Sequence, residues 1–351
     1  MSKYARKSIN KLSAYVPGEQ PRPGEKIIKL NTNENPYPPA PGVQKALCTF
    51  NPEVLRKYPQ PLADTFRLEA SNIFQIDPDQ IITGNGSDEI IAMIFRTFVG
   101  PGDTVAWPIP TYSYYPCQAQ MQEAKVVELP FDENFDLPEK LEKINARVFF
   151  IANPNAPSGT LIPPARIETF AKKIKGLVVV DEAYADFAQS NCLDLAKRLP
   201  NLLVMRTLSK SYSLAGLRFG FAFASKQIIT DLLKVKDSYN CDAISIHLAT
   251  QAIRDQKYLK ANVEKIIAQR NWLTAQLRSL NFTVQDSQTN FIWAVVPKKQ
   301  NAKLIYQQLK SDGILVRYFD KRGLSNGLRI SIGKPAENRK LIENLKRIIP
   351  Q

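Results

Sequence analysis

The sequence is poor in residues that many enzymes use for catalysis and metal binding. It holds one histidine, His247, which lies among apolar residues of an expected helix, so catalysis by histidine has little support. Its four cysteines, Cys48, Cys117, Cys192 and Cys241, are widely spaced and form no C-x-x-C pair. Neither a disulfide framework nor a zinc site is indicated, and we expect no bound metal.

Long apolar runs are absent as well. No segment reaches the length that spans a membrane, and the N-terminal residues lack the apolar core of a signal peptide. We therefore expect a cytoplasmic protein with no membrane partner. The net charge of +14 would suit a nucleic-acid surface, but the basic residues are dispersed along the chain and form no long block. A basic surface that attracts anionic substrates explains this better, and we expect no nucleic-acid partner.

What is present is a chain of 351 residues, long enough for two domains. The run Leu-Val-Val-Val at 177–180 is typical of a strand buried on both faces of a parallel sheet. Alternating strand and helix patterns predict an α/β large domain over 29–243, with a mostly parallel central sheet flanked by helices. Residues 244–351 have the pattern of a smaller α+β domain, which an N-terminal arm, 1–28, is expected to join.

The segment 202–220 is the one around which the expected chemistry is organised. An apolar strand ends there in hydroxyl residues around Lys210, and a second apolar strand follows. A lysine at a strand end is partly removed from water, which favours the neutral amine that attacks carbonyl groups. Ser209 and Arg218 add a hydroxyl and a guanidinium suited to a phosphate. An isolated Ser-Lys pair is usually an exposed loop, but the G-L-R-F-G tail makes that explanation less convincing.

Polar residues follow several other expected strands. Gly86, Ser87 and Asp88 lie between a strand and a helix, where backbone N–H groups and the helix dipole favour an anion. A helix capped by Ser87 explains the segment about equally well. Asp181 ends the buried strand, at the edge where α/β sheets bind ligands, although a helix-capping aspartate is the simpler alternative. Tyr112 follows a third strand, either to stack on a flat ring or to belong to the core.

The T-L-S-K sequence that ends in Lys210, together with the G-L-R-F-G tail, resembles the Schiff-base segment of fold-type I pyridoxal-phosphate enzymes, specifically the aminotransferases. The resemblance covers nearly the whole chain, with the motifs in the expected order. It implies the fold-type I architecture, pyridoxal 5′-phosphate as cofactor, and a homodimer. By motif, Lys210 carries the cofactor, Asp181 pairs with its ring nitrogen N1, Tyr184 donates to its phenolic oxygen, and Tyr112 stacks on its ring.

The other cofactor contacts are implied in the same way. Contacts to the phosphate are implied for Gly86, Ser87, Asp88, Ser209 and Arg218. Tyr58 resembles a residue that reaches the phosphate across a dimer interface. One position departs from the family's N-P-T-G motif, because Ala156 stands where an asparagine usually donates to the phenolic oxygen. Asn155, one residue earlier, is the expected substitute.

Four further stretches, Y-V-P-G, L-N-T-N-E-N-P, V-R-Y-F and G-L-R-I-S-I-G, resemble the histidinol-phosphate aminotransferase branch of the family. The resemblance implies a step of histidine biosynthesis, in which histidinol phosphate and 2-oxoglutarate give imidazole acetol phosphate and glutamate. It places Tyr15, Asn33, Arg317 and Arg329 at the substrate. A threonine-phosphate decarboxylase and a broader aromatic amino-acid aminotransferase remain as alternatives. A transcription regulator would need a helix-turn-helix before the first expected strand, at 27–30, where there is little room.

Overall fold

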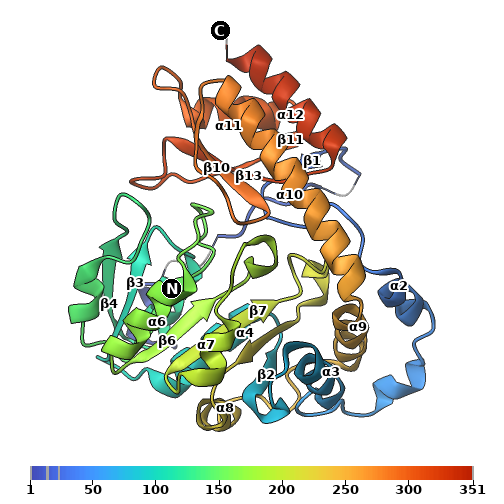
Figure 1. Cartoon of the computed structure of the whole chain (residues 1–351), viewed down its shortest axis with the longest axis vertical. Coiled ribbons are helices and arrows are strands. Elements are labelled where there is room, and N and C mark those ends of the chain that lie inside the picture. The colour runs from blue at the N-terminus through green and yellow to red at the C-terminus, as the bar shows by residue number, and fades with distance from the viewer. Residues whose placement is uncertain (1, 13–15, 23, 350–351) are drawn as a thin grey trace.

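A central sheet organises the larger part of the computed structural model, which describes residues 2–12, 16–22 and 24–349 (Figure 1). Its strands are β2 (Ile81–Gly84), β3 (Thr104–Ile109), β4 (Lys125–Pro130), β5 (Val148–Ala152), β6 (Leu177–Asp181), β7 (Leu202–Thr207) and β8 (Gly220–Phe223). The seven strands have the order β2-β8-β7-β6-β5-β3-β4. Neighbours pair in parallel except β8, which runs antiparallel to β7 and β2. The expected mostly parallel sheet is confirmed.

Helices cover both faces of this sheet, because its strands bury side chains on both sides. In β5, Val148 and Phe150 belong to one hydrophobic core, while Phe149 and Ile151 belong to the other. The first core is covered by α4 (Ser87–Phe98), α5 (Tyr114–Met121) and α8 (Lys226–Leu233). The second is covered by α2 (Pro41–Cys48), α3 (Asp64–Phe74), α6 (Pro164–Lys173), α7 (Leu193–Arg198) and α9 (Ala243–Arg254). The result is the three-layer α/β architecture predicted for the large domain.

A smaller antiparallel sheet lies at the other end of the molecule (Figure 1). Its strands are β9 (Thr283–Val284), β10 (Phe291–Val295), β12 (Arg317–Tyr318) and β13 (Gly327–Ser331), and the surrounding helices are α10 (Gln256–Ser279), α11 (Ala302–Ser311) and α12 (Pro335–Ile348). A parallel pair, β1 (Ile28–Lys29) with β11 (Ile314–Leu315), ties the N-terminal segment to this α+β part. Since α9 packs against α2 and α3, and α10 runs on to the small sheet, the boundary between 243 and 244 stays a prediction.

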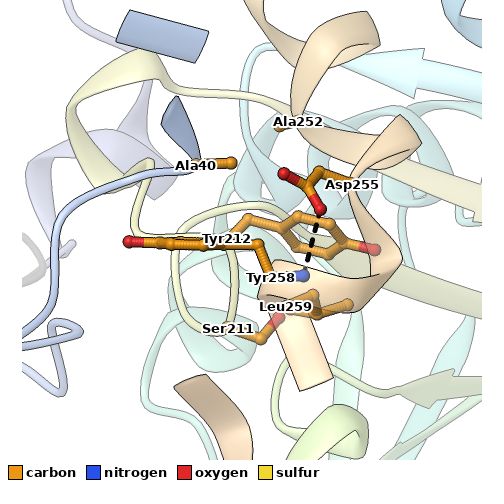
Figure 2. A pocket seen from close by; sticks show the side chains of 7 residues that line it. All are labelled: Ala40, Ser211, Tyr212, Ala252, Asp255, Tyr258 and Leu259. Atoms are coloured by element: carbon orange, nitrogen blue, oxygen red, sulfur yellow. Dashed lines mark hydrogen bonds between the residues drawn. The ribbon is translucent and has the colours of Figure 1, made fainter. Parts of the chain in front are cut away.

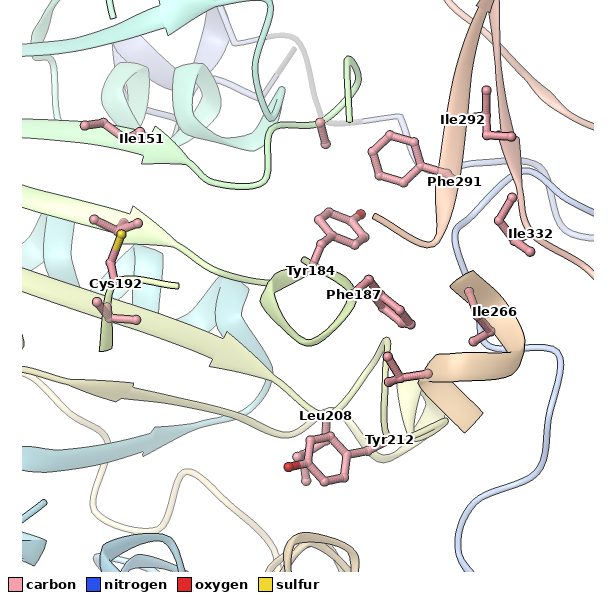
Figure 3. Packing of buried hydrophobic residues seen from close by; sticks show 14 of the residues in the cluster. Ile151, Tyr184, Phe187, Cys192, Leu208, Tyr212, Ile266, Phe291, Ile292 and Ile332 are labelled. Atoms are coloured by element: carbon pink, nitrogen blue, oxygen red, sulfur yellow. The ribbon is translucent and has the colours of Figure 1, made fainter. Parts of the chain in front are cut away.

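The remaining elements of the described residues are short. They are α1 (Lys7–Asn10) and the 3-10 turns η1 (Pro52–Arg56), η2 (Pro78–Gln80), η3 (Glu139–Lys143), η4 (Ala185–Phe187) and η5 (Ala215–Leu217). Just after β6, Tyr184 faces Phe291 of β10, and Phe187 points toward Ile266 of α10 (Figure 3). The rings of Tyr184 and Phe291 meet edge to face, with 5.1 Å between their centres. The small sheet is therefore packed directly over the carboxyl edge of the large one.

Candidate active site

The carboxyl edge of the central sheet gathers several of the predicted site residues. Asn155 follows β5, Asp181 ends β6, and Lys210 follows β7. These three strands are direct, parallel neighbours, so their carboxyl ends meet at the same edge. Tyr112 follows β3, the next strand beyond β5. The topology thus forms a ligand site of the kind that open α/β sheets place at this edge.

Asp181 lies deep at this edge, with only 6 % of its surface exposed. Its Oδ2 accepts a hydrogen bond from the Tyr115 hydroxyl at 2.8 Å, and its Oδ1 accepts one from the Ala183 N–H at 3.2 Å. Burial raises the pKa of Asp181 to about 6, while these two donors oppose the rise. A buried carboxylate in this position is suited to a protonated ring nitrogen. It ends a strand and caps none of the described helices, so the helix-capping alternative is wrong.

Lys210 points from the turn after β7 toward the N-terminal segment. Its Nζ donates to the carbonyl oxygen of Thr32 at 3.3 Å and lies 5.8 Å from the centre of the Tyr184 ring. The Tyr184 hydroxyl accepts a hydrogen bond from Asn33 Nδ2 at 2.9 Å. Lys210, Tyr184 and Asn33 are therefore brought together from three distant parts of the chain. Thr32 lies in the L-N-T-N-E-N-P stretch, from which only Asn33 was predicted for the site, and its carbonyl is the direct contact between the lysine and that segment.

The N-terminus of α4 and Arg218 form an anion cradle beside this edge. Gly86 is the N-cap of α4, with φ of +80°, and Ser87 is the first helical residue, so the alternative of a helix capped by Ser87 is wrong. A Cβ on Gly86 would lie 2.6 Å from a guanidinium nitrogen of Arg218, a side chain that could shift, so it is the positive φ that favours glycine here. Asp88 accepts from the Tyr112 hydroxyl at 3.0 Å and pairs with Arg218 at 3.4 Å. First-turn N–H groups and a guanidinium are the donors that bind phosphate.

Asn155 is buried beside Ala156, and its side-chain nitrogen makes hydrogen bonds whereas its side-chain oxygen makes none. Its Nδ2 donates to the carbonyl of Pro110 at 3.0 Å and to Ser158 Oγ at 2.8 Å. Its Oδ1 is buried without a hydrogen-bond partner. Asn155 thus presents an unpaired acceptor. To replace the asparagine that is missing at Ala156, Asn155 would have to donate a hydrogen bond from Nδ2. It could do so only if one of these two bonds broke or the amide turned over.

Ser209 is also buried, and it is held from within its own turn. Its backbone N–H donates to Thr207 Oγ1 at 3.1 Å, and its hydroxyl accepts from the same Thr207 oxygen at 2.9 Å. This fixes the direction of the chain between β7 and Lys210. The predicted contact of Ser209 with the phosphate stays a prediction.

Two arginines of the small sheet reach the N-terminal segment. Arg317 on β12 and Arg329 on β13 lie opposite each other in the antiparallel register. Arg329 donates to the Asn31 carbonyl at 3.0 Å, and Arg317 donates to the carbonyls of residues 16–17 at 3.0 and 3.1 Å. Both guanidinium groups therefore lie close to the segment that contacts Lys210. Tyr15, predicted to close over the substrate, lies outside the described residues.

Tyr58 lies apart from this cluster on the surface of the single chain. It is 80 % exposed and stacks on Tyr239 with 4.4 Å between ring centres. With Phe50 and His247 it lines an open groove of about 680 Å³. His247 itself packs at 5.6 Å from the Phe50 ring. In one chain, therefore, Tyr58 faces solvent.

Comparison with known proteins agrees with this geometry. The family model of aminotransferase class I and II matches residues 25–345. The chain belongs to this family. This aminotransferase is 44 % identical over 350 residues to histidinol-phosphate aminotransferase 1 of Trichormus variabilis, covering 99 % of this chain and 100 % of the relative. It is 45 % identical over 343 residues to the histidinol-phosphate aminotransferase of Syntrophotalea carbinolica, covering 98 % and 99 %.

A solved structure supports the same assignment. The aminotransferase resembles the crystal structure of histidinol-phosphate aminotransferase from Sinorhizobium meliloti in complex with pyridoxal-5′-phosphate, with a TM-score of 0.90 and 25 % identity. The likeness covers 99 % of this chain and 98 % of that one. The sequence prediction of a fold-type I aminotransferase is thereby confirmed.

A buried charge network behind the site was not predicted from the sequence. Glu182 accepts from Arg206 Nε at 3.1 Å and from a terminal nitrogen of the same guanidinium at 2.8 Å. Another nitrogen of Arg206 lies 3.8 Å from Asp186, which accepts from the Ser211 hydroxyl. Glu182 and Ser211 directly follow the two central site residues, so the network ties the ends of β6 and β7 together. An arginine inside an apolar strand was the signal that could have revealed it.

A small cavity of about 10 Å³ lies behind the lysine turn between Ser211, Tyr212 and Tyr258 (Figure 2), with room for about one water. Within the described residues, no helix is long and apolar enough to cross a membrane. In that same part of the chain, no group of three or more His, Cys, Asp or Glu side chains is arranged to hold a metal ion.

Proposed function

We propose that this aminotransferase binds pyridoxal 5′-phosphate at the carboxyl edge of the central sheet. The donor set fits the group: an amine on Lys210, a deeply buried carboxylate on Asp181, and a cradle of backbone N–H groups with Arg218. The buried Oδ1 of Asn155 has no partner, but it is an acceptor, so Asn155 fits the phenolic oxygen only with its amide turned over. When bound, the cofactor supplies an electron sink for the carbon that carries the substrate amine.

Each residue has a role in that arrangement. Lys210 would hold the cofactor through its amine, and the same amine, when free, would move a proton as general base and then general acid. Asp181 would keep the ring nitrogen protonated, and Tyr184 would donate to the phenolic oxygen, as would Asn155 once its amide turned over or released one of its present partners. Tyr112 lies over the ring. The phosphate contacts are Gly86, Ser87, Asp88, Ser209 and Arg218.

Reduction with borohydride tests the attachment. The pyridoxyl group should become fixed on Lys210, as located by peptide mapping, because the reduction makes the carbon–nitrogen link permanent. The Lys210→Ala variant should carry no label. A label on any other lysine of the wild type would rule out this assignment.

The proposed reaction converts histidinol phosphate and 2-oxoglutarate to imidazole acetol phosphate and glutamate. The observation that carries it is the full-length identity of 44 % to a relative of that name. Arg317 and Arg329 provide paired guanidinium groups for the anionic ends of these substrates. Asn33 lines the site, and Tyr15 is proposed to close over it.

A homodimer is part of the proposal. Large apolar side chains are exposed on η1, on α2 and α3, which both pack against α9, and on the turns beside them: Leu47, Val54, Leu55, Tyr58, Leu68 and Tyr239. An apolar surface of this kind, next to an open groove, favours burial against a second copy. Tyr58 would then reach the phosphate cradle of the neighbouring chain. A cytoplasmic location remains a prediction from the sequence.

A substrate panel tests the reaction. We expect kcat/KM for histidinol phosphate to exceed that for histidinol and for phenylalanine by about a hundredfold or more, because losing the phosphate leaves guanidinium charges unpaired. Product identity is scored in parallel. Carbon dioxide release from threonine phosphate would mark the decarboxylase instead. Equal activity on phenylalanine would indicate a general aromatic aminotransferase.

A further inference from the structure

We propose that Tyr115, which belongs to none of the motifs considered above, is a positioning residue that keeps the Asp181 carboxylate ionised and aimed at the cofactor ring nitrogen. The inference rests on the proposed cofactor site and adds a residue to it. Tyr115 does not reach the cofactor in this assignment. It acts through Asp181 alone.

The geometry fixes the Tyr115 hydroxyl. The residue lies in the first turn of α5 and has no exposed surface. Its ring stacks on Phe150 at 4.8 Å and meets Tyr112 edge-on at 5.6 Å, and the Trp107 ring centre lies at 6.0 Å. Packed on these sides, the ring cannot swing away, so the hydroxyl stays 2.8 Å from Asp181 Oδ2. A donor held this rigidly fixes the orientation of the carboxylate as well.

Electrostatics make the hydroxyl a permanent donor. Burial, and then the neighbouring charge of Asp181, raise the pKa of Tyr115 well above its ordinary value, so its proton is retained at every working pH. On Asp181, burial favours the neutral acid, and the Tyr115 bond is the strongest effect that opposes it. Asp88 adds to the effect of burial, whereas the Ala183 N–H and Lys210 oppose it. Without the hydroxyl, Asp181 would bind its proton more tightly.

The consequence concerns a single proton shared between the Asp181 carboxylate and the ring nitrogen N1. It resides on whichever of the two has the higher affinity for it. The Tyr115 hydrogen bond lowers the affinity of Asp181, which leaves the proton on N1. Because a protonated N1 is what makes the ring an electron sink, Tyr115 contributes to catalysis without touching the substrate.

The first experiment uses the cofactor-free chain. In Tyr115→Phe, the Asp181 carboxyl should titrate about one pH unit higher than in the wild type, followed by carbon-13 NMR of labelled aspartate. Phenylalanine keeps the ring contacts, so only the hydroxyl is lost. Tyr258→Phe, which removes a hydroxyl that donates to the Pro38 carbonyl at 3.0 Å, is the matched control and should leave that titration unchanged. An unchanged midpoint in Tyr115→Phe overturns the inference.

The second experiment separates positioning from a merely structural role. Pyridoxal phosphate should bind Tyr115→Phe about tenfold more weakly than it binds the wild type, because the carboxyl must first be ionised and oriented. An analogue with carbon in place of N1 should bind both proteins equally. Equal weakening of both ligands, or of neither, overturns the inference. If the wild type binds neither ligand, the proposed cofactor function fails; if it binds the cofactor and Tyr115→Phe binds it equally well, only this inference fails.

Discussion

At the scale of single residues, the site contains a carboxylate that is removed from water, where its negative charge is least stable. Asp181 is buried, and its pKa is raised to about 6 from an ordinary value of 3.8, chiefly by removal from water. Burying the ionised carboxyl group lowers the free energy of unfolding. A bound cofactor with a positively charged ring nitrogen would offset this loss. A residue that opposes stability in the absence of a ligand is typical of a binding site.

Replacing Asp181 by asparagine should stabilise the cofactor-free chain at pH 8 and change little at pH 4. Between the two pKa values the folded chain holds a proton that the unfolded chain releases, so wild-type stability falls as pH rises through about 4 to 6. A pKa difference of about two between the folded and unfolded chain corresponds to roughly 3 kcal/mol. Urea unfolding at both pH values measures this, with the exposed Asp194→Asn as control for the lost charge. An advantage of Asp181→Asn that is equal at both pH values would contradict the argument.

Motifs predicted the residues that lie at strand ends, and missed those that act through contacts between distant segments. Lys210, Asp181 and Gly86 are marked by their place between a strand and the next turn or helix. Thr32 and Tyr115 carry no such mark. Thr32 matters because its carbonyl meets a lysine far away in the sequence, and Tyr115 because its hydroxyl meets Asp181. Such pairings depend on the sheet order, which one sequence does not display.

At the scale of elements, strands with continuous apolar runs were predicted well, and short helices were not. No helix is predicted from the sequence over α2, α5 or α7. α7 has six residues, and α5 carries a proline and buries Tyr115, Gln118 and Ala119 without a clear apolar stripe. Periodicity needs more length or contrast than these provide. The apolar residues at 314–318 form two strands, β11 and β12, because β11 pairs with β1 and β12 with β13.

The network between β6 and β7 makes a prediction about stability. Glu182→Gln should lower the free energy of unfolding by about 3–5 kcal/mol, because it leaves the Arg206 charge buried beside a neutral amide. The exposed pair of Lys340 and Glu343 is a matched control, and Glu343→Gln should cost only about 0–1 kcal/mol. Combining Glu182→Gln with Arg206→Met should recover part of the loss. Chemical denaturation that finds equal costs for the two glutamates would exclude a stabilising role for the buried pair.

At the scale of the whole molecule, the site is assembled from both sheets and from the N-terminal segment. Arg317 holds residues 16–17, and Lys310 pairs with Glu19 at 2.7 Å, so the segment is attached mainly to the small sheet. The same segment includes Thr32, whose carbonyl oxygen accepts a hydrogen bond from Lys210 at the end of a strand of the large sheet. Any change in how the two sheets pack would therefore alter the surroundings of the lysine.

The proposed homodimer is tested by mixing two inactive variants. In a dimer of a Lys210→Ala chain with a Tyr58→Ala chain, one site combines an intact Lys210 with the intact Tyr58 of the other chain, if Tyr58 acts across the interface. The other site carries both changes. Random exchange makes half of the dimers mixed, so about a quarter of the wild-type activity should return when the two variants are refolded together.

Each variant refolded alone is the control, and should remain impaired. Tyr58→Ala should bind the cofactor more weakly, which a titration of the cofactor-free protein measures, while its fold is preserved because the side chain is 80 % exposed. If mixing restores nothing although both variants fold and form dimers, Tyr58 serves the site of its own chain or no site at all. In either case the apolar surface around Tyr58 would require a different explanation from shared active sites.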